Sequence, residues 1–443
     1  MKLPVALALL LPAALVACEA PPGSSSSSTS ASDAASPNAS ILPAPLATEA
    51  DEPTDAGPPD GAPIGLLADP SGRLIVPDAG PPPPGVLRGD EAIAAEAPAS
   101  KDLAGATLEA VFRLRDVPPA PRAPEVSQDG IKAAAELTAP KWKIDLTDTG
   151  RMRIEFASRA MPLPKRSEIR ARADRYGHVV LWPDATDYRV VPPGALRTVL
   201  GERRVDVTPL SPGVARPLGD GKRLQLATRK VEITSSLGSV RLELGKSAEI
   251  GEGGALLCRA LVEIVGVDPR TSVCQSGEVP LAAAYTWQDG GGIDFEVTTL
   301  TRRTDIPTNE TLVPPPGSAY QASGLPTSPG GVFLTRDEVA AFRTGVPQGL
   351  GPSTDPLAPG EGFIAVNASD MLAYVLVDGV PVVAVPPNDQ RYVIGTARGR
   401  YVIQWRTFLG DRIGPSSTID MPARLSFGEA PDAGAPDAGG TSN

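Results

Sequence analysis

The chain contains few side chains of the types that carry out chemistry near neutral pH. Histidine is the usual proton shuttle in that range, and the 443 residues include one, His178. Apolar residues surround it in segment 176–182, so we interpret it as a packed or surface histidine at a strand start, with a catalytic role as the alternative. A zinc site would need further ligands, and no Gly-x-Ser-x-Gly motif of an activated serine is present. The sequence therefore predicts no metal and no cofactor.

Two glycine-rich segments have some features of ligand-binding loops. Residues 251–254 read Gly-Glu-Gly-Gly before a predicted helix, and exposed N–H groups at a helix start attract anions. The third glycine of a dinucleotide-binding motif would fall on Leu256, however, and no Gly-Lys-Ser/Thr follows, so we predict a flexible turn. Residues 289–294 offer oxygen ligands for calcium but lack the spacing of an EF-hand, and we interpret them as a hairpin turn.

The N-terminus has the pattern of an export signal. Lys2 supplies a positive charge, residues 3–16 are mostly apolar, and small residues precede Cys18. A transmembrane helix needs about 20 apolar residues, so this segment is too short and is interrupted by Pro12. We therefore predict that residues 1–17 are a signal peptide that is removed.

Leu15, Val16, Ala17 and Cys18 together resemble the bacterial lipobox. The resemblance implies that the thiol of Cys18 is acylated with diacylglycerol and that cleavage occurs just before it. Glu19 stands where the inner-membrane retention signal usually has aspartate, which implies sorting to the outer membrane. The expected location is thus the cell envelope, with the lipid on Cys18 as the membrane anchor.

The two remaining cysteines, Cys258 and Cys274, are expected to form one disulfide. Export places them in an oxidising compartment, where a pair of cysteines is oxidised by default. In the chain-entropy model, closing a loop of about 15 residues contributes on the order of 3 kcal/mol. A redox-active pair is the alternative, but the spacing is far from Cys-x-x-Cys.

Residues 18–100 are predicted to be a disordered tether. They contain a serine run at 24–28, many alanines and prolines, and twelve acidic residues against two arginines. Low hydrophobicity with one sign of charge is typical of disorder, and proline extends such linkers. We also predict a disordered tail at 428–443. These segments carry the acidity of the chain, since 101–428 has a net charge of +1.

Residues 101–314 are predicted to form a larger β-rich domain. Apolar and charged residues alternate with a period of two, which indicates half-buried antiparallel sheet, and turn-forming clusters separate the runs. Two short helices are expected at 131–137 and 255–264, and 315–359 is expected to be a spacer with a short helix at 336–342. The clearest predicted strands are 108–114, 151–156, 230–233, 240–244 and 293–297.

Residues 360–427 are predicted to form a small β-sandwich of five strands, at 363–366, 373–377, 380–385, 390–394 and 399–405. Asp378-Gly379 is a strong hairpin signal, because a primed turn needs positive φ. The strand opened by Gly362, the Val-Asp-Gly turn at 377–379, Pro386 and the Gly-Arg-Tyr strand at 399–401 resemble the PEGA domain family, although Pro-Glu-Gly-Ala itself is absent. The resemblance implies a non-catalytic envelope module that binds protein or carbohydrate.

Positive charge gathers within the larger β-rich domain. Residues 141–244 carry twenty Lys or Arg against twelve acids, whereas 245–360 carry seven against thirteen. The basic segment could meet an anionic envelope polymer, but balance between the two segments within the protein is the interpretation we favour. Nucleic acid is not an expected partner of an exported lipoprotein.

Taken together, these patterns favour a non-enzyme. We predict a mainly β, outer-membrane-anchored lipoprotein that acts as a non-catalytic binding or scaffolding module, with an envelope protein or carbohydrate as partner. The alternative is a carboxylate-dependent hydrolase acting on envelope polysaccharide or peptidoglycan, because two acids can be brought together from anywhere in the chain. Nothing in the sequence selects such a pair.

Overall fold

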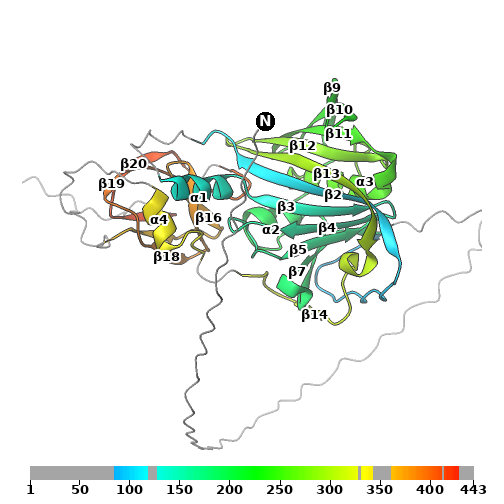
Figure 1. The fold of residues 1–443 in the computed structure, drawn as a ribbon, viewed down its shortest axis with the longest axis horizontal. Coiled ribbons are helices and arrows are strands. Elements are labelled where there is room, and N and C mark those ends of the chain that lie inside the picture. Colours follow the sequence, from blue (N-terminus) through cyan, green and yellow to red (C-terminus); the bar gives the residue numbers. More distant parts are fainter. Residues whose placement is uncertain (1–83, 118–126, 328–330, 343–360, 412–413, 429–443) are drawn as a thin grey trace, which may run out of the picture. The chain divides into compact units, whose positions relative to one another are not determined.

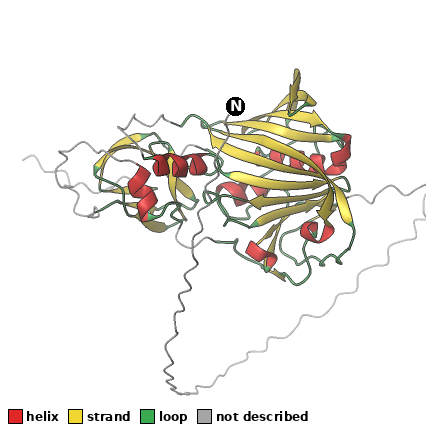
Figure 2. Ribbon diagram, in the orientation of Figure 1, coloured by secondary structure: helices red, strands yellow, loops and turns green. Residues whose placement is uncertain are grey.

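The computed structural model describes residues 84–117, 127–327, 331–342, 361–411 and 414–428, all within one compact unit, Pro77–Asn443. These residues are mainly strand, with short helices between them (Figure 2), so the predicted β class is confirmed. Cys18, most of the predicted tether and the predicted tail from 429 onward lie outside the described residues. Among the helices that the structure describes, none is both long and apolar enough to cross a membrane.

A twelve-stranded sheet dominates the described residues (Figure 1). Its strand order is β14-β8-β7-β5-β4-β3-β2-β13-β12-β11-β10-β9, and all neighbours are antiparallel except β14 and β8. The strands are β2 (Asp102–Leu114), β3 (Lys141–Thr147), β4 (Arg151–Phe156), β5 (Glu168–Arg172), β7 (His178–Leu181), β8 (Asp187–Val191), β9 (Val214–Arg223), β10 (Leu226–Thr234), β11 (Gly238–Lys246), β12 (Glu278–Trp287), β13 (Ile293–Pro307) and β14 (Ala319–Tyr320).

The alternation predicted from the sequence sets the two faces of this sheet. In β4, Met152, Ile154 and Phe156 are buried while the residues between them are partly exposed. β11 has the same pattern, and the long strands β2 and β13 pair with each other to join two meanders. Burying one face and leaving charge on the other is the expected arrangement of an antiparallel sheet with one solvated side.

Helix α3 (Gly251–Ile264) covers the apolar face, packing on β12, β3 and β4 (Figure 1). The other helices are α1 (Gln128–Thr138), α2 (Leu196–Gly201) and α4 (Arg336–Phe342), and the two predicted helices therefore lie within α1 and α3. Ser127 caps α1 by accepting a hydrogen bond from the Gly130 N–H at 3.0 Å. A short parallel pair, β1 (Gly85–Val86) with β6 (Arg175–Tyr176), lies apart from the large sheet's ladder.

The C-terminal strands form two further sheets. One has the order β18-β15-β21 and the other β17-β16-β19-β20, with β15 (Phe363–Asn367), β16 (Ala373–Val377), β17 (Val380–Val385), β18 (Asp389–Val393), β19 (Gly399–Arg406), β20 (Ser417–Met421) and β21 (Ala423–Phe427). All five predicted strands are present. Asp378 and Gly379 have φ values of 49° and 81° and join β16 to β17, so the predicted hairpin turn is confirmed.

Two segments that we expected to lie outside the folded part are packed against it. Within 84–100, Leu87 is buried and Glu96 forms ion pairs with Arg151 and Arg172. Beyond residue 314, β14 adds a strand beside β8. The sequence did not indicate this, because both segments are short and polar and their order comes from contacts with residues far along the chain.

Glu96 anchors the first of these segments. Its carboxylate accepts hydrogen bonds from Arg151 Nη1 at 2.6 Å and from the Val313 N–H at 2.7 Å. Burial alone would raise the pKa of Glu96, but these hydrogen bonds outweigh it and hold the pKa below its ordinary value of 4.5. A lowered pKa stabilises the folded state above that ordinary value, and the contribution is lost as the pH falls through the folded-state pKa.

We therefore expect Glu96→Gln to release residues 84–100 from the sheet. The measurement is the rate of tryptic cleavage after Arg88, whose neighbour Leu87 is buried. Cleavage should be faster in Glu96→Gln, and acidification through the lowered pKa of Glu96 should weaken the same contact in the wild type. Glu91→Gln is the matched control, since Glu91 is exposed. Equal cleavage rates in both variants would contradict the anchoring role of Glu96.

Candidate functional site

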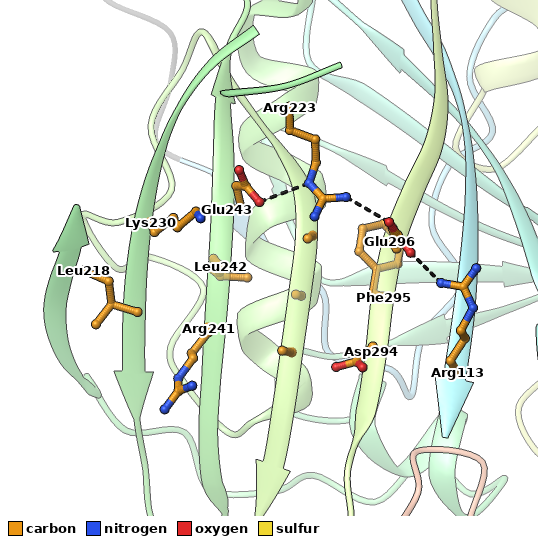
Figure 3. A pocket seen from close by; sticks show the side chains of 13 residues that line it. Arg113, Leu218, Arg223, Lys230, Arg241, Leu242, Glu243, Asp294, Phe295 and Glu296 are labelled. Atoms are coloured by element: carbon orange, nitrogen blue, oxygen red, sulfur yellow. Dashed lines mark hydrogen bonds and ion pairs between the residues drawn. The ribbon is translucent and has the colours of Figure 1, made fainter. Parts of the chain in front are cut away.

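The face of the large sheet opposite α3 carries an open groove of about 350 Å³ over strands β9 to β13 and β2 (Figure 3). We call it the β-sheet groove. Ala282 and Ala284 on β12 form a floor of small side chains, and charged side chains stand on both sides of it. The residues that line it are Arg113, Leu218, Arg223, Lys230, Arg241, Leu242, Glu243, Ala282, Ala283, Ala284, Asp294, Phe295 and Glu296.

Most charged residues of the groove are already paired with one another. Arg223 lies 3.0 Å from Oε2 of Glu243 and 2.9 Å from Oε1 of Glu296. Arg113 pairs with Glu296 from the other side, so a ladder of alternating charge crosses four strands (Figure 3). This ladder holds the side chains in place before any ligand arrives.

The carboxyl groups of the groove differ in their electrostatic surroundings. Hydrogen bonds from Arg113 and Arg223 hold the pKa of Glu296 below its usual range. Burial would raise the pKa of Glu243, but hydrogen bonds from Thr228 and Arg223 outweigh it. Asp294 is different: burial raises its pKa, and Arg115, with Nε 3.5 Å away, offsets this only in part. Asp294 is thus the acid of the groove that is most readily protonated.

His178 lies in a second, much smaller pocket of about 20 Å³, which we call the His178 pocket. The histidine is at the start of β7 and is 5% exposed, and its Nε2 lies 3.1 Å from Oε2 of Glu263 on α3. Glu263 is 2% exposed, and its Oε1 accepts hydrogen bonds from the N–H groups of Gly194 and Leu196 at 2.8 and 3.2 Å. The interpretation of a packed histidine at a strand start is confirmed.

The pocket is lined by Ala171, Arg175, Tyr176, Gly177, His178, Leu256, Arg259, Glu263 and Pro269. Burial raises the pKa of Tyr176, whose hydroxyl donates to Asp268 at 3.3 Å. A hydrogen bond from Arg270 holds the pKa of Asp268 below its usual range. Sequence reasoning identified His178 but not its partner, because Glu263 is 85 residues away.

The structure places the two glycine-rich segments at the start of a helix and in a hairpin turn. The prediction of a flexible turn at 251–254 is wrong, since these residues form the first turn of α3. Glycines are needed there because α3 lies so close to the sheet that a side chain does not fit. A Cβ on Gly253 would lie 2.5 Å from the Thr147 carbonyl oxygen. The predicted hairpin turn is present where residues 288–292 join β12 to β13. Within the described part of the chain, no group of three or more His, Cys, Asp or Glu side chains could hold a metal ion.

The basic segment 141–244 is largely neutralised inside the protein. Arg170 is buried and pairs with Glu168 at 2.7 Å, and Arg172 pairs with Asp174 at 2.6 Å. Arg153 contacts four different acids, among them Asp145 at 3.1 Å. The pairs of Arg223 with Glu296 and of Arg229 with Glu278 join 141–244 to 245–360, and these support the favoured interpretation of balance between the two segments.

The structure places Cys258, on α3, and Cys274, in the loop that follows, with Cα atoms 5.5 Å apart. This separation lies within the range for a disulfide, and the structure joins the two sulfur atoms. Both residues are buried, and neither lines the β-sheet groove. The oxidised state in the cell stays a prediction, and we interpret the pair as a structural link between α3 and its loop.

We expect non-reducing peptide mapping of protein isolated from the envelope to find the peptides of Cys258 and Cys274 linked. Replacing Cys274 by serine should lower the free energy of unfolding by about 3 kcal/mol, because the unfolded chain gains the freedom of an open loop. A thermal melt with and without reductant checks this. The reductant should destabilise the wild type but leave Cys274→Ser unchanged. Free thiols at both positions would show that the pair is reduced.

The groove residues were not identified from the sequence. Arg113, Arg223 and Glu296 come from strands separated by tens to hundreds of residues, and only the pairing of β2 with β13 and of β9 with β10 brings them together. The available signal was the charged half of each alternating strand, which marks the solvent face but does not reveal which strands are neighbours. Cys18, the predicted lipidation site, lies outside the described residues.

Comparison with known proteins gives no family for this chain. No protein-family model matches it, and no curated protein matches it. Among solved structures, an uncharacterized conserved protein of Thermus thermophilus has 8% identity and a TM-score of 0.26, over 49% of this chain and 90% of that one. A LolA superfamily protein from Nitrosomonas europaea has 9% identity and a TM-score of 0.22, over 48% of this chain and 91% of that one.

The MucA/MucB complex of Pseudomonas aeruginosa has 11% identity and a TM-score of 0.22, over 45% of this chain and 52% of that one. TM-scores below 0.5 identify neither a shared function nor a shared ligand. The lipobox and PEGA resemblances stay predictions, and a ligand has to be inferred from the residues of the chain itself.

Proposed function

We propose that this chain is an outer-membrane-anchored lipoprotein whose β-structured part is a non-catalytic binding module of the cell envelope. The observation that carries the proposal is the β-sheet groove, an open surface of about 350 Å³ whose charged side chains are held in place by their own ion pairs. Binding loses less free energy when side chains are ordered beforehand. The groove therefore suits a polar ligand, such as an envelope protein segment or a carbohydrate.

The same ion pairs argue against catalysis in the groove. The residues that line it include no serine, cysteine or histidine, so a reaction there would depend on carboxylates. Glu296 accepts hydrogen bonds from two arginines, and Glu243 accepts them from Arg223 and Thr228. Carboxylates that accept such hydrogen bonds are poor nucleophiles and bases, because their lone pairs are already occupied and their charge is balanced by arginine.

The test is site-specific photo-cross-linking in intact cells. A photoreactive residue at Ala284, on the floor of the groove, should give an adduct with an envelope component, and filling the groove with Ala282→Trp should abolish that adduct. A photoreactive residue at Thr299 is the control, because it is exposed on β13 but does not line the groove. Adducts of equal yield at both positions would show that the groove is not a binding site.

A hydrolase is the second candidate, favoured by one observation. Asp294, with a raised pKa, and Glu296, with a lowered pKa, line the same groove, and glycoside hydrolases use a protonated acid beside an ionised carboxylate. Release of soluble fragments from purified peptidoglycan sacculi distinguishes the two functions. If the wild type releases fragments and Asp294→Asn does not, the groove is catalytic and the binding proposal fails.

A further inference from the structure

In the His178 pocket, Nδ1 of His178 has no hydrogen-bond partner among the described residues, and two arginines, Arg175 and Arg259, have no close acidic partner there. We propose that this pocket binds a single carboxylate group, and that His178 takes up one proton as the carboxylate binds. The proposal rests on the geometry of His178, Arg175 and Arg259, and it does not depend on the lipid anchor or on the β-sheet groove.

The imidazole ring is oriented by Glu263. The Glu263 carboxylate accepts two backbone N–H groups on one oxygen and faces Nε2 of His178 at 3.1 Å on the other. An ionised carboxylate accepts hydrogen bonds and does not donate them, so with Glu263 ionised, Nε2 of His178 carries the proton and donates to it. Nδ1 is then left for another partner.

That partner is missing among the described residues. Nδ1 of His178 is buried and has no hydrogen-bond partner there. A buried polar atom without a partner costs free energy, so its persistence calls for an explanation. Gly177, with φ at +121°, holds the backbone before the ring, since a Cβ there would lie 2.7 Å from the Val191 carbonyl oxygen. The ring is therefore held with Nδ1 unpaired.

Two guanidinium groups line the same pocket. Arg259 on α3 has its acidic contact with Glu252 at 3.9 Å, a long distance for an ion pair, and its side chain is 27% exposed. Arg175 on β6 donates to the Val313 carbonyl oxygen at 3.4 Å, and no ion pair is recorded for it in the described part of the chain. Positive groups with such weak partners attract an anion, and guanidinium groups match the planar carboxylate.

The size of the pocket limits the ligand. A volume of about 20 Å³ is close to the space that one water molecule needs, so one oxygen atom of the carboxylate enters and the remainder of the ligand stays outside. The partial exposure of Arg259 shows that the pocket reaches the surface. Glu263 also lines the pocket, but hydrogen-bond donors surround its carboxylate. Its negative charge therefore repels a bound carboxylate less strongly.

A proton must accompany the carboxylate. A carboxylate oxygen accepts hydrogen bonds and does not donate them, and the neutral ring presents a lone pair at Nδ1. Contact therefore requires a proton on Nδ1, taken from solution. The resulting imidazolium donates from Nε2 to Glu263 and from Nδ1 to the ligand, and its added positive charge balances the negative charge of the carboxylate.

Other titratable and charged groups also face the ring. They are Glu263 and Arg259 on α3, Arg175 and Tyr176 on β6, and Asp268 and Arg270 in the loop after α3. Burial raises the pKa of Tyr176, and the hydrogen bond from Arg270 lowers the pKa of Asp268. Both pKa values therefore move further from neutral pH. Histidine is the side chain that ordinarily changes charge there.

The chain's single histidine makes the test direct. Full-length protein, purified without a histidine tag and labelled with ¹⁵N-histidine, gives one pair of ring nitrogen signals. Without ligand at about pH 7.5, Nε2 should be protonated and Nδ1 not. Adding sodium acetate should shift the Nδ1 signal to the protonated position, whereas sodium chloride at equal ionic strength should not. Uptake of one proton per ligand predicts that the acetate affinity rises about tenfold for each pH unit lowered.

Variants separate this site from a general salt effect. The double variant Arg175→Gln with Arg259→Gln should lose the acetate response, whereas Arg270→Gln, which contacts the Tyr176 ring but does not line the pocket, should keep it. In His178→Asn, acetate binding measured by calorimetry should become weak and independent of pH. Glucuronate and glutamate, compared with acetate, show whether a sugar acid or an amino acid binds more tightly. An Nδ1 signal that responds equally to acetate and chloride, or not at all, would overturn the proposal.

Discussion

Replacing Cys18 by alanine is expected to move the protein from the membrane fraction to the soluble fraction. The physical reason is the loss of the acyl chains, each buried CH₂ of which contributes about 0.8 kcal/mol of membrane affinity. Stable anchoring takes more than one chain, and the diacylglycerol implied by the lipobox resemblance supplies two.

Fractionation after cell lysis measures this, with metabolic labelling by a radioactive fatty acid as the direct assay of the lipid. Cys18→Ala also blocks the cleavage that the lipobox implies, so a second variant is needed. In it, residues 1–18 are replaced by the cleavable signal peptide of a secreted, non-lipidated protein. Both variants should lack label, and the second should be fully soluble. An unlabelled wild type would show that Cys18 is not acylated.

Gly254→Ala is expected to destabilise the fold by about 3 kcal/mol, at the upper end of the usual cost of overpacking. Gly254 lies in the first turn of α3, and a Cβ at this position would lie 2.0 Å from the Glu278 carbonyl oxygen and 2.9 Å from its carbonyl carbon. Both atoms belong to the backbone of β12, so neither can rotate away. The helix would have to move off the sheet and open space in the core, and the melting temperature should fall by roughly 6 to 12 °C.

The direction of the change in stability tests the packing of α3, because intrinsic helix propensity predicts a change in the opposite direction. Alanine is favoured over glycine within a helix by about 1 kcal/mol, so Gly254→Ala would be stabilising if α3 were loosely packed. Gly85→Ala is the matched control: no atom lies within 4 Å of its added Cβ, and its melting temperature should stay close to that of the wild type. Thermal melts followed by circular dichroism compare the two. A melting temperature that rises in Gly254→Ala would contradict the close packing of α3 on β12.

Sequence reasoning found the strands, helices and turns whose own residues show a clear pattern. The alternation in 151–156 and 240–244 predicted β4 and β11, and Asp378-Gly379 predicted the turn between β16 and β17. Strands with weak alternation were missed. In β9, every residue from Val214 to Lys222 is exposed, so its pairing with β10 leaves no apolar pattern to recognise.

The glycines of 251–254 show how a correct local observation led to a wrong structure. Glycine-rich sequence is typical of turns, because glycine adopts conformations that other residues avoid. Here Gly253 and Gly254 are helical, and they are required because backbone of β3 and β12 occupies the space of a side chain. The spacing of the glycines in the sequence does not show how close β3 and β12 lie to α3.

The sequence by itself determined the properties that depend on composition and short-range pattern: the β class, the faces of the clearest strands, and the shortage of side chains for nucleophilic or metal chemistry. Only the tertiary structure decided which charged residues meet. The Glu263 that orients His178 is 85 residues from it, and Arg113 and Glu296 are 183 residues apart. The alternation of a strand is the same whichever strands are its neighbours, so the order of the strands, and with it both pockets, follows from the packing of the whole chain.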